Sequence, residues 1–276
     1  LLSGKNDFEM LVNKFREAGI NNVKISAGYR LSYPDERLFT FYLDEFETKL
    51  FDLPEGVYTC LIENEDCEEQ ILTPGMDDEI FSRTKVPMTK NEVRVLSISR
   101  LELTKKAVVY DVGSGTGSVS VECARLSPDI AVFAIEQKEE AANLTKENAV
   151  RLGLSDQIMV INKKAPEGFE ELPTPTHVFI GGSSGALSDI LSAIQKKLIV
   201  KENTKGVRVV INAVSLETIA QITKLIQTYP VKHVQLTQIQ ASRAHKLGSY
   251  NLMQAQNPVL IASFNLLPDD KMEADE

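Results

Sequence analysis

From about Asn91 onward, the chain alternates short apolar runs with segments whose apolar residues recur at helical spacing. The apolar runs predict strands over residues 107–113, 131–137, 157–163, 176–182, 207–214, 233–242 and 259–265. The helical spacing predicts helices over residues 91–103, 119–126, 139–153, 187–198 and 216–229. This alternation predicts an α/β fold, with a mostly parallel sheet covered by helices on both faces. Because no helix separates the last two predicted strands, we expect the sheet to end in an antiparallel strand.

The N-terminal part shows a shorter pattern, with a predicted helix over 7–19 and predicted strands over 21–27 and 56–64. It opens abruptly inside an α/β arrangement, so we expect residues 1–62 to be the later half of a domain. Residues 63–79 are acidic and irregular, with the breaker pair Pro74-Gly75, and predict a linker. The main domain is then expected over residues 80–276.

Composition narrows the class of protein. The 276 residues are 43% hydrophobic and 25% charged, as in ordinary globular proteins. The net charge of −9 argues against a general nucleic-acid binder, and no apolar run is long enough to span a membrane. Cys60, Cys67 and Cys123 lack metal-ligand spacing and are odd in number. We therefore expect no metal site, no disulfide framework and a reducing, cytoplasmic setting.

A glycine-rich loop follows the first strand of the main domain, in "VVYDVGSGTGSVSVECARL" (residues 108–126). Gly113, Gly115 and Gly117 let the backbone approach a ligand closely at the carboxyl end of the sheet. Asp111 precedes the loop, and Glu136 ends the next strand, where an acid can accept hydrogen bonds from both ribose hydroxyls. The loop therefore predicts a nucleoside-containing ligand.

The loop's spacing favours one ligand over another. A dinucleotide fingerprint reads G-x-G-x-x-G, whereas this loop reads G-x-G-x-G, and the acid at Asp111 would repel a pyrophosphate. The same acid suits the ammonium group of S-adenosylmethionine, which carries no phosphate. The sequence therefore favours an S-adenosylmethionine-dependent methyltransferase, with dinucleotide binding and a purely structural glycine turn left as alternatives.

Four segments carry a more specific resemblance: "PMTKNEVRVLSISRLEL" (87–103), "DVGSGTGSVSVECA", "APEGFEELPTPTHVFIGGSSG" (165–185) and "NPV" (257–259). They resemble the decarboxylating precorrin-6B C15-methyltransferases of cobalamin biosynthesis, which often form the C-terminal half of precorrin-6Y C5,15-methyltransferases. "GYRLSYPDERLFTFYLDEF" (28–46) resembles the closing half of a tetrapyrrole methylase, the C5-methylating part of that fused enzyme. The resemblance implies a Rossmann-like class I methyltransferase domain with a seven-stranded sheet, and an N-terminal remnant without activity of its own.

The resemblance also implies a reaction and its cofactor. A methyl group passes from S-adenosylmethionine to C15 of a tetrapyrrole, and the acetate on ring C loses carbon dioxide. The implied partners are a polycarboxylate precorrin-6B or cobalt-precorrin-6B and other copies of the chain, commonly in a tetramer, with no nucleic acid or membrane. A nucleic-acid methyltransferase is expected to have a base-stacking motif at the position of "FIGGSSG", and this segment contains none. A cofactor-binding module without turnover stays open.

Site residues follow by position in these motifs. The implied cofactor-binding residues are Thr89, Asp111, Gly113, Ser114, Gly115, Thr116, Gly117, Glu136 and Ala165. Lys164 precedes Ala165 where the family commonly has an acid. The implied catalytic positions, close to the transferred methyl group, are Gly181, Gly182 and Ser183.

A polycarboxylate substrate requires cationic partners, because buried carboxylates without partners are costly. The predicted substrate-binding residues are Arg94, ahead of the first strand, and Arg243 and His245 in "QASRAHKLGSY", which reads as a polar loop at the end of the sheet. Arg243 is the strongest of the three.

Overall fold

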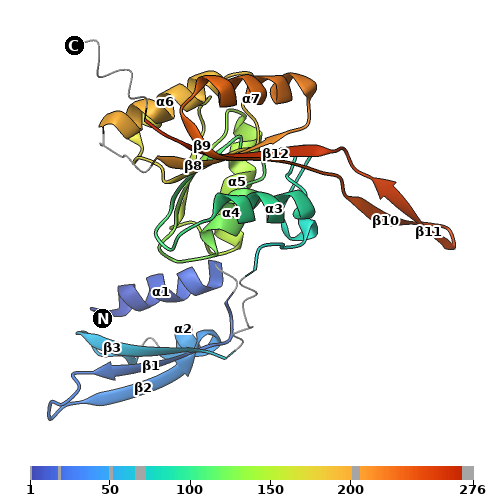
Figure 1. The fold of residues 1–276 in the computed structure, drawn as a ribbon. Coiled ribbons are helices and arrows are strands. Elements are labelled where there is room, and N and C mark those ends of the chain that lie inside the picture. The colour runs from blue at the N-terminus through green and yellow to red at the C-terminus, as the bar shows by residue number, and fades with distance from the viewer. Residues whose placement is uncertain (1, 18–19, 50–51, 66–72, 201–205, 269–276) are drawn as a thin grey trace. The chain divides into compact units, whose positions relative to one another are not determined.

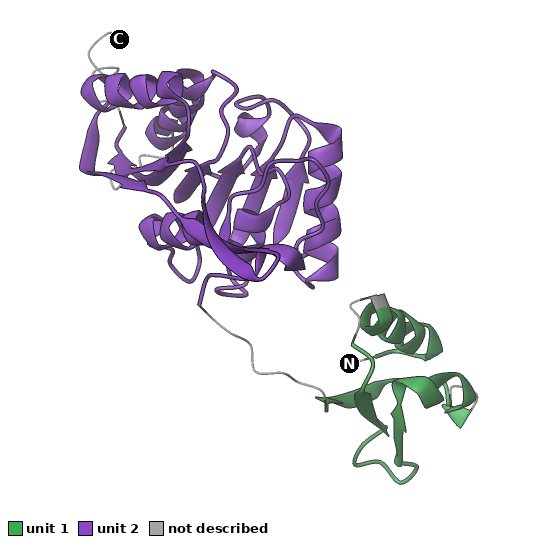
Figure 2. Ribbon diagram, turned by 90° about the vertical axis from the view of Figure 1, so that its right-hand side faces the viewer, with its two compact units in different colours: residues 1–71 green, residues 72–276 purple. Residues whose placement is uncertain are grey.

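The computed structural model describes residues 2–17, 20–49, 52–65, 73–200 and 206–268. The chain divides into two compact units, residues 1–71 and 72–276 (Figure 2). This division falls inside the predicted linker, of which residues 66–72 lie outside the described residues.

The first unit packs one helix on a three-stranded antiparallel sheet. Its elements are α1 (Lys5–Glu17), β1 (Val23–Tyr29), β2 (Arg37–Tyr42), the short α2 (Phe46–Lys49) and β3 (Tyr58–Asn64), with sheet order β2-β1-β3. Phe8 and Val12 of α1 form a core with Ile25 of β1 and Tyr58 of β3. The sequence analysis did not identify β2.

The second unit contains a seven-stranded sheet (Figure 1). Its strands are β4 (Val108–Val112), β5 (Ala131–Ile135), β6 (Ile158–Ile161), β7 (His177–Ile180), β8 (Val207–Ala213), β9 (Val231–Ile239) and β12 (Val259–Leu266). The order is β6-β5-β4-β7-β8-β12-β9, and the strands from β6 to β8 pair in parallel. β12 pairs antiparallel with both β8 and β9, which confirms the expected antiparallel end of the sheet.

Helices cover both faces of this sheet. They are α3 (Asn91–Leu101), α4 (Ser118–Ala124), α5 (Glu139–Arg151), α6 (Leu187–Val200) and α7 (Leu216–Thr228). Tyr110 and Val112 of β4 point into a core with α6 and α7, whereas Val109 points into a second core with α3 and α4. Burial on both faces explains why these strands read as continuous apolar runs. None of the described helices is both long and apolar enough to cross a membrane.

A two-stranded hairpin, β10 (Ser242–Leu247) and β11 (Tyr250–Ala255), projects from the end of β9 and β12 (Figure 1). The expectation of a polar loop over residues 240–250 was therefore wrong. None of the hairpin residues is buried, so neither strand needs the alternation of apolar and polar residues that marks a half-buried strand.

Candidate active site

The loops after β4 and β7 pack directly against each other at the carboxyl end of the sheet. The N–H groups of Gly181 and Gly182 both donate to the carbonyl oxygen of Val112, at 2.9 and 3.3 Å. Gly113 has φ +74°, and a Cβ built there would lie 2.6 Å from the carbonyl oxygen of Gly182. Only glycine combines this backbone angle with this approach.

A cavity of about 450 Å³ opens beside the glycine loop. Its lining includes Pro87, Gly113, Gly115, Ile135, Glu136, Ala165, Gly181, Gly182 and Ser183, together with Lys85, Lys138, Lys163 and Lys164. The predicted cofactor residues Gly113, Gly115, Glu136 and Ala165 thus meet on one cavity, called the smaller cavity below. The ends of β4 and β5 and the loops after β4, β5, β6 and β7 contribute to it.

Glu136 is held rigidly at the edge of the smaller cavity. Its Oε2 accepts a hydrogen bond from the N–H of Gly115 at 3.1 Å, and its Oε1 accepts one from the N–H of Lys138 at 2.9 Å. Asn162 donates to the carbonyl oxygen of Glu136 at 2.8 Å. The carboxylate therefore couples the end of β5 to the glycine loop, and its remaining acceptor capacity can serve a ligand.

Asp111 lies just beneath the loop and is buried. Its Oδ2 accepts a hydrogen bond from the hydroxyl of Ser120, whereas Oδ1 is buried with no partner in the described part of the chain. Burial is the main reason that the pKa of Asp111 is raised to about 6. A carboxylate in this state would be stabilised by a cationic group placed beside it.

The remaining loop residues face away from the smaller cavity. Ser114 pairs its hydroxyl with that of Thr145 at 3.2 Å, and Thr116 has no exposed surface. A Cβ at Gly117 would lie 2.7 Å from a methyl carbon of Thr145. These residues dock the loop on α5, so Thr116, which lines neither cavity, can act only by shaping the loop.

A second cavity, of about 1130 Å³ and called the larger cavity below, adjoins the first. It shares Pro87 and residues 181–184 with the smaller cavity. Its described lining includes the cations Arg83, Lys90 and Arg243 and the imidazole of His245, but no carboxylate. Thr89 lies here, among residues of the larger cavity, apart from the other predicted cofactor residues.

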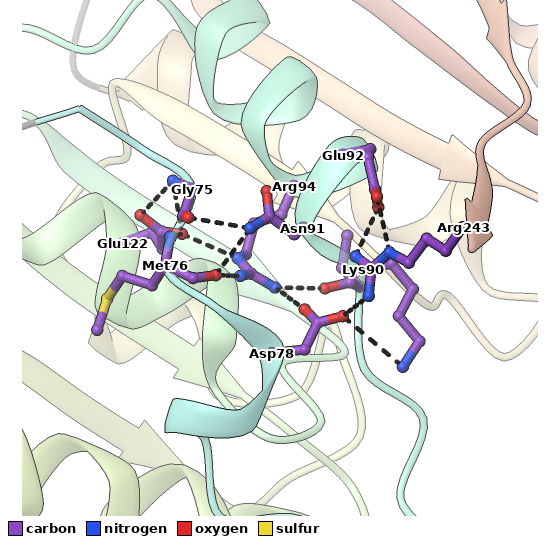
Figure 3. Close-up of polar contacts among 10 residues, drawn as sticks. Gly75, Met76, Asp78, Lys90, Asn91, Glu92, Arg94, Glu122 and Arg243 are labelled. Atoms are coloured by element: carbon purple, nitrogen blue, oxygen red, sulfur yellow. Dashed lines mark hydrogen bonds and ion pairs between the residues drawn. The ribbon is translucent and has the colours of Figure 1, made fainter. Parts of the chain in front are cut away.

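Arg94 does not reach either cavity, so its predicted role in substrate binding is wrong. Its side chain has no exposed surface and is held by Glu122 at 3.0 Å and Asp78 at 3.1 Å (Figure 3). It also donates to the carbonyl oxygens of Thr89 and Met76. The N–H groups of Arg94 thus donate to groups in the protein interior and not to a cavity.

Arg243 and His245 lie on β10 and line the larger cavity. Arg243 is ion-paired with Glu92 at 2.7 Å and with Asp78 at 3.0 Å, and the sequence analysis did not predict these ion pairs.

The sequence analysis also missed Pro87, which lines both cavities. Its carbonyl oxygen lies 2.8 Å from where a Cβ of Gly115 would stand. The only signal was its position as the first residue of the segment 87–103, which carries part of the family resemblance.

Comparisons with known proteins agree on one family. The model of the precorrin methyltransferase domain matches residues 79–265. Probable cobalt-precorrin-6B C15-methyltransferases (decarboxylating) from Pyrobaculum calidifontis and Saccharolobus solfataricus are 39% and 33% identical. The alignments cover 68% and 71% of this chain and 94% and 98% of those proteins.

Solved structures give the same result. Precorrin-6Y C5,15-methyltransferase from Geobacter metallireducens is similar with a TM-score of 0.64 and 30% identity, over 70% of this chain and 97% of that one. A precorrin 8w decarboxylase from Methanobacterium thermoautotrophicum is similar with a TM-score of 0.63 and 31% identity, over 69% of this chain and 100% of that one. An S-adenosylmethionine-dependent O-methyltransferase from Thermotoga maritima, 15% identical at a TM-score of 0.57, shares the fold.

Proposed function

The chain belongs to the precorrin methyltransferase family, and we propose that residues 72–276 methylate C15 of a precorrin-6B-type tetrapyrrole and remove carbon dioxide from its ring C acetate. This is the reaction named for the relatives that are at least 30% identical and match nearly along their whole length. A nucleic-acid methyltransferase and a module without turnover are not favoured by these relatives. The reaction would take place in the cytoplasm, which is consistent with the free thiols of Cys60 and Cys123.

S-adenosylmethionine supplies the methyl group, on a sulfonium that is already electrophilic. The residues of the smaller cavity fit this molecule: Glu136 can accept from the ribose hydroxyls, and Ile135 and Ala165 offer apolar walls to adenine. Asp111 lines neither cavity, but its buried Oδ1 has no partner among the described residues, and its charge just beneath the glycine loop suits an ammonium group held above it. Thr89, Ser114, Thr116 and Gly117 are proposed to act through the backbone and shape of the surrounding loops.

The cationic lining of the larger cavity is the observation that carries the substrate assignment. The protein has a net charge of −9, yet three cations and a histidine converge here without a carboxylate in the described lining. A polycarboxylate substrate is matched by such a lining, because each carboxylate needs a charged partner when it leaves water. We assign Arg243 and His245 to this contact and leave Arg94 out of it.

The shared wall of the two cavities is where we propose that the reacting atoms meet. Gly181, Gly182 and Ser183 line both cavities, so a group held on one side meets a group held on the other at this wall. A Cβ at Gly182 would meet no atom within 4 Å, so the absent side chain leaves open space for a flat macrocycle. These residues are proposed to orient the reactants and exclude water, the main tasks for a transfer between an electrophile and an electron-rich ring carbon.

The hairpin β10–β11 supports an oligomeric assembly. Leu247, Tyr250 and Leu252 lie on one face of it, as the pairings Leu247–Tyr250 and His245–Leu252 require, and all three are exposed. An apolar face on a projecting hairpin is typical of a contact between protein chains. We propose that a second copy of this chain covers it, in a homo-oligomer such as a tetramer.

For residues 1–71 we propose descent from the closing half of a tetrapyrrole methylase. The segment of residues 28–46 that carries this resemblance forms the end of β1, β2 and the start of α2. The family model does not extend into this unit, since its match begins at residue 79. The unit is proposed to add no methyl transfer of its own.

One experiment tests these proposals together: mass spectrometry of the product formed from precorrin-6B, with and without cobalt, in the presence of S-adenosylmethionine. We expect a gain of one methyl group and a loss of one carbon dioxide. Unchanged substrate in both forms, with cofactor still bound, would contradict the proposed reaction. A second methyl group would contradict the assignment of residues 1–71.

A further inference from the structure

The guanidinium group of Arg243 is shared between two carboxylates (Figure 3). Its Nε and Nη2 donate to the two carboxylate oxygens of Glu92, both at 2.7 Å, and its Nη1 donates to Asp78 at 3.0 Å. Glu92 therefore occupies the two-donor edge of Arg243, the edge that matches a carboxylate with two parallel hydrogen bonds. Arg243 itself lines the larger cavity.

The two carboxylates are not equally bound. Asp78 is 2% exposed and is also held by the fully buried Arg94 at 3.1 Å. The side chain of Glu92 is 40% exposed, lies at the start of α3 and, in the described part of the chain, is ion-paired with Arg243 alone. Removing a partner from a buried carboxylate is costly, whereas exposed ion pairs contribute little. Asp78 is thus the permanent partner of Arg243, and Glu92 is the exchangeable one.

We propose that Glu92 is a placeholder for a carboxylate of the substrate. On binding, a substrate carboxylate takes the Nε and Nη2 edge of Arg243, Glu92 turns into solvent, and Asp78 keeps Nη1. This inference rests on the proposed function, since it needs a polycarboxylate ligand in the larger cavity. It assigns the acidic residue of "TKNEVR" a role in setting how tightly substrates bind.

Three features of the structure favour the exchange. Arg243 stays oriented after Glu92 leaves, because Asp78 holds it from the interior side and Asp78 is itself held by Arg94. Glu92 lies in the first turn of α3, where a negative charge is stabilised by the helix even without Arg243. The exchange replaces one doubly hydrogen-bonded carboxylate by another, so the number of charge-assisted hydrogen bonds is unchanged.

The test measures binding of a stable tetrapyrrole polycarboxylate, uroporphyrin, to the full chain by its fluorescence. Glu92→Gln removes the competing charge and keeps the shape of the side chain. We expect uroporphyrin to bind about 2- to 5-fold more tightly than to the wild type, which corresponds to the small contribution of an exposed ion pair. Equal or weaker binding by Glu92→Gln would overturn the proposal.

Two further variants separate the exchange from a general charge effect. Glu79→Gln removes the same charge from the turn beside Asp78, at an exposed residue, and should leave the affinity near the wild-type value. Arg243→Lys keeps the charge but lacks the two-donor edge, so adding Glu92→Gln to it should produce no tightening. Tightening by Glu79→Gln to the same extent, or by Glu92→Gln in the Arg243→Lys background, would contradict the exchange.

The wild-type chain distinguishes failure of the inference from failure of the proposed function. Binding of uroporphyrin by the wild type, with no tightening in Glu92→Gln, would remove the placeholder role and leave the substrate class in place. No binding by the wild type would contradict the substrate class, and the inference would fall with it.

Discussion

Gly113 is the first residue of the glycine loop after β4, and it packs against Gly182 in the wall between the two cavities. Its φ of +74° disfavours any other residue, and a Cβ would enter the backbone of Gly182 at 2.6 Å. Gly113→Ala should therefore lower the free energy of unfolding by about 2–5 kcal/mol, combining backbone strain with overpacking. It should also weaken binding of S-adenosylmethionine, because the loops after β4 and β7 must separate.

Gly153 provides the matched control for this change. Its φ of +69° is nearly the same, but a Cβ there would meet nothing within 4 Å. Gly153→Ala should cost only the backbone strain, about 1–2 kcal/mol, and leave cofactor affinity unchanged. Chemical unfolding and calorimetry measure both quantities, and equal losses in the two variants would show that the contact with Gly182 does not matter.

Asp111 predicts a pH dependence whose sign follows from its raised pKa. Its folded-state pKa of about 6 exceeds the ordinary value of 3.8 for an aspartate, so folding favours the protonated form. The stability that this group contributes is fully present below pH 3.8 and is lost as the pH rises through about 6. Relative to Asp111→Asn, the wild type should lose about 3 kcal/mol between these limits, as measured by urea unfolding.

Binding of S-adenosylmethionine should show the opposite trend at Asp111. Only the ionised carboxylate attracts an ammonium group, so the affinity of the wild type should rise as the pH increases through about 6. Asp111→Asn should bind more weakly and lack this rise. Calorimetry at pH 5 and pH 7 compares the two chains, and a parallel pH dependence in both would exclude Asp111 as a partner of the cofactor.

At the scale of single residues, the sequence predicts where a residue lies in the fold better than it predicts which side chains surround it. Gly113, Gly115 and Glu136 could be assigned to one cavity because they follow parallel strands, which end at the same edge of a sheet, and Ala165 because of the family resemblance. Arg94 could not be assigned correctly. Its burial depends on Asp78 and Glu122, which are distant in sequence, and a lone arginine in a helix gives no sign of such partners.

Among the elements, the sequence identified the strands that carry an apolar pattern, whether or not they are buried. Each predicted strand of the main domain is present; most have a buried face, and β9, which has none, still shows apolar residues at Val234, Leu236 and Ile239. β10 and β11 were missed because they are exposed and contain no Val, Ile or Thr to mark them as strands. Their position therefore comes from pairing with each other and from the paths of β9 and β12, which local sequence does not encode.

The hairpin carries a prediction of its own about assembly. Leu252 is 51% exposed and lies on the face with Leu247 and Tyr250, so Leu252→Glu places a charge in the proposed interface. Sedimentation should show a smaller species than for the wild type at the same concentration. Asn251 lies opposite Lys246 on the other face, so Asn251→Glu should leave the assembly intact. Dissociation by both variants, or by neither, would contradict this interface.

At the scale of the whole molecule, each unit has its own hydrophobic core, and the described linings of both cavities lie within residues 72–276. Residues 73–79, predicted as linker, belong to the larger unit and are hydrogen-bonded to it, with Asp78 buried in its interior. Glu122 accepts hydrogen bonds from the N–H groups of Gly75 and Met76, at 3.0 and 2.9 Å. The effective start of the domain is thus earlier than residue 80.

Two fragments test where the domain begins. The fragment 73–276 should bind S-adenosylmethionine as tightly as the full chain and unfold in one cooperative transition. The fragment 80–276 lacks Gly75, Met76 and Asp78, so Arg94 and Glu122 keep their mutual ion pair but lose their other partners there, inside a core where neither has exposed surface. Breaking the buried pair of Arg94 with Asp78 costs up to about 3–5 kcal/mol, and we expect a loss of stability within that limit. Equal stability of the two fragments in urea would show that residues 73–79 act as a linker after all.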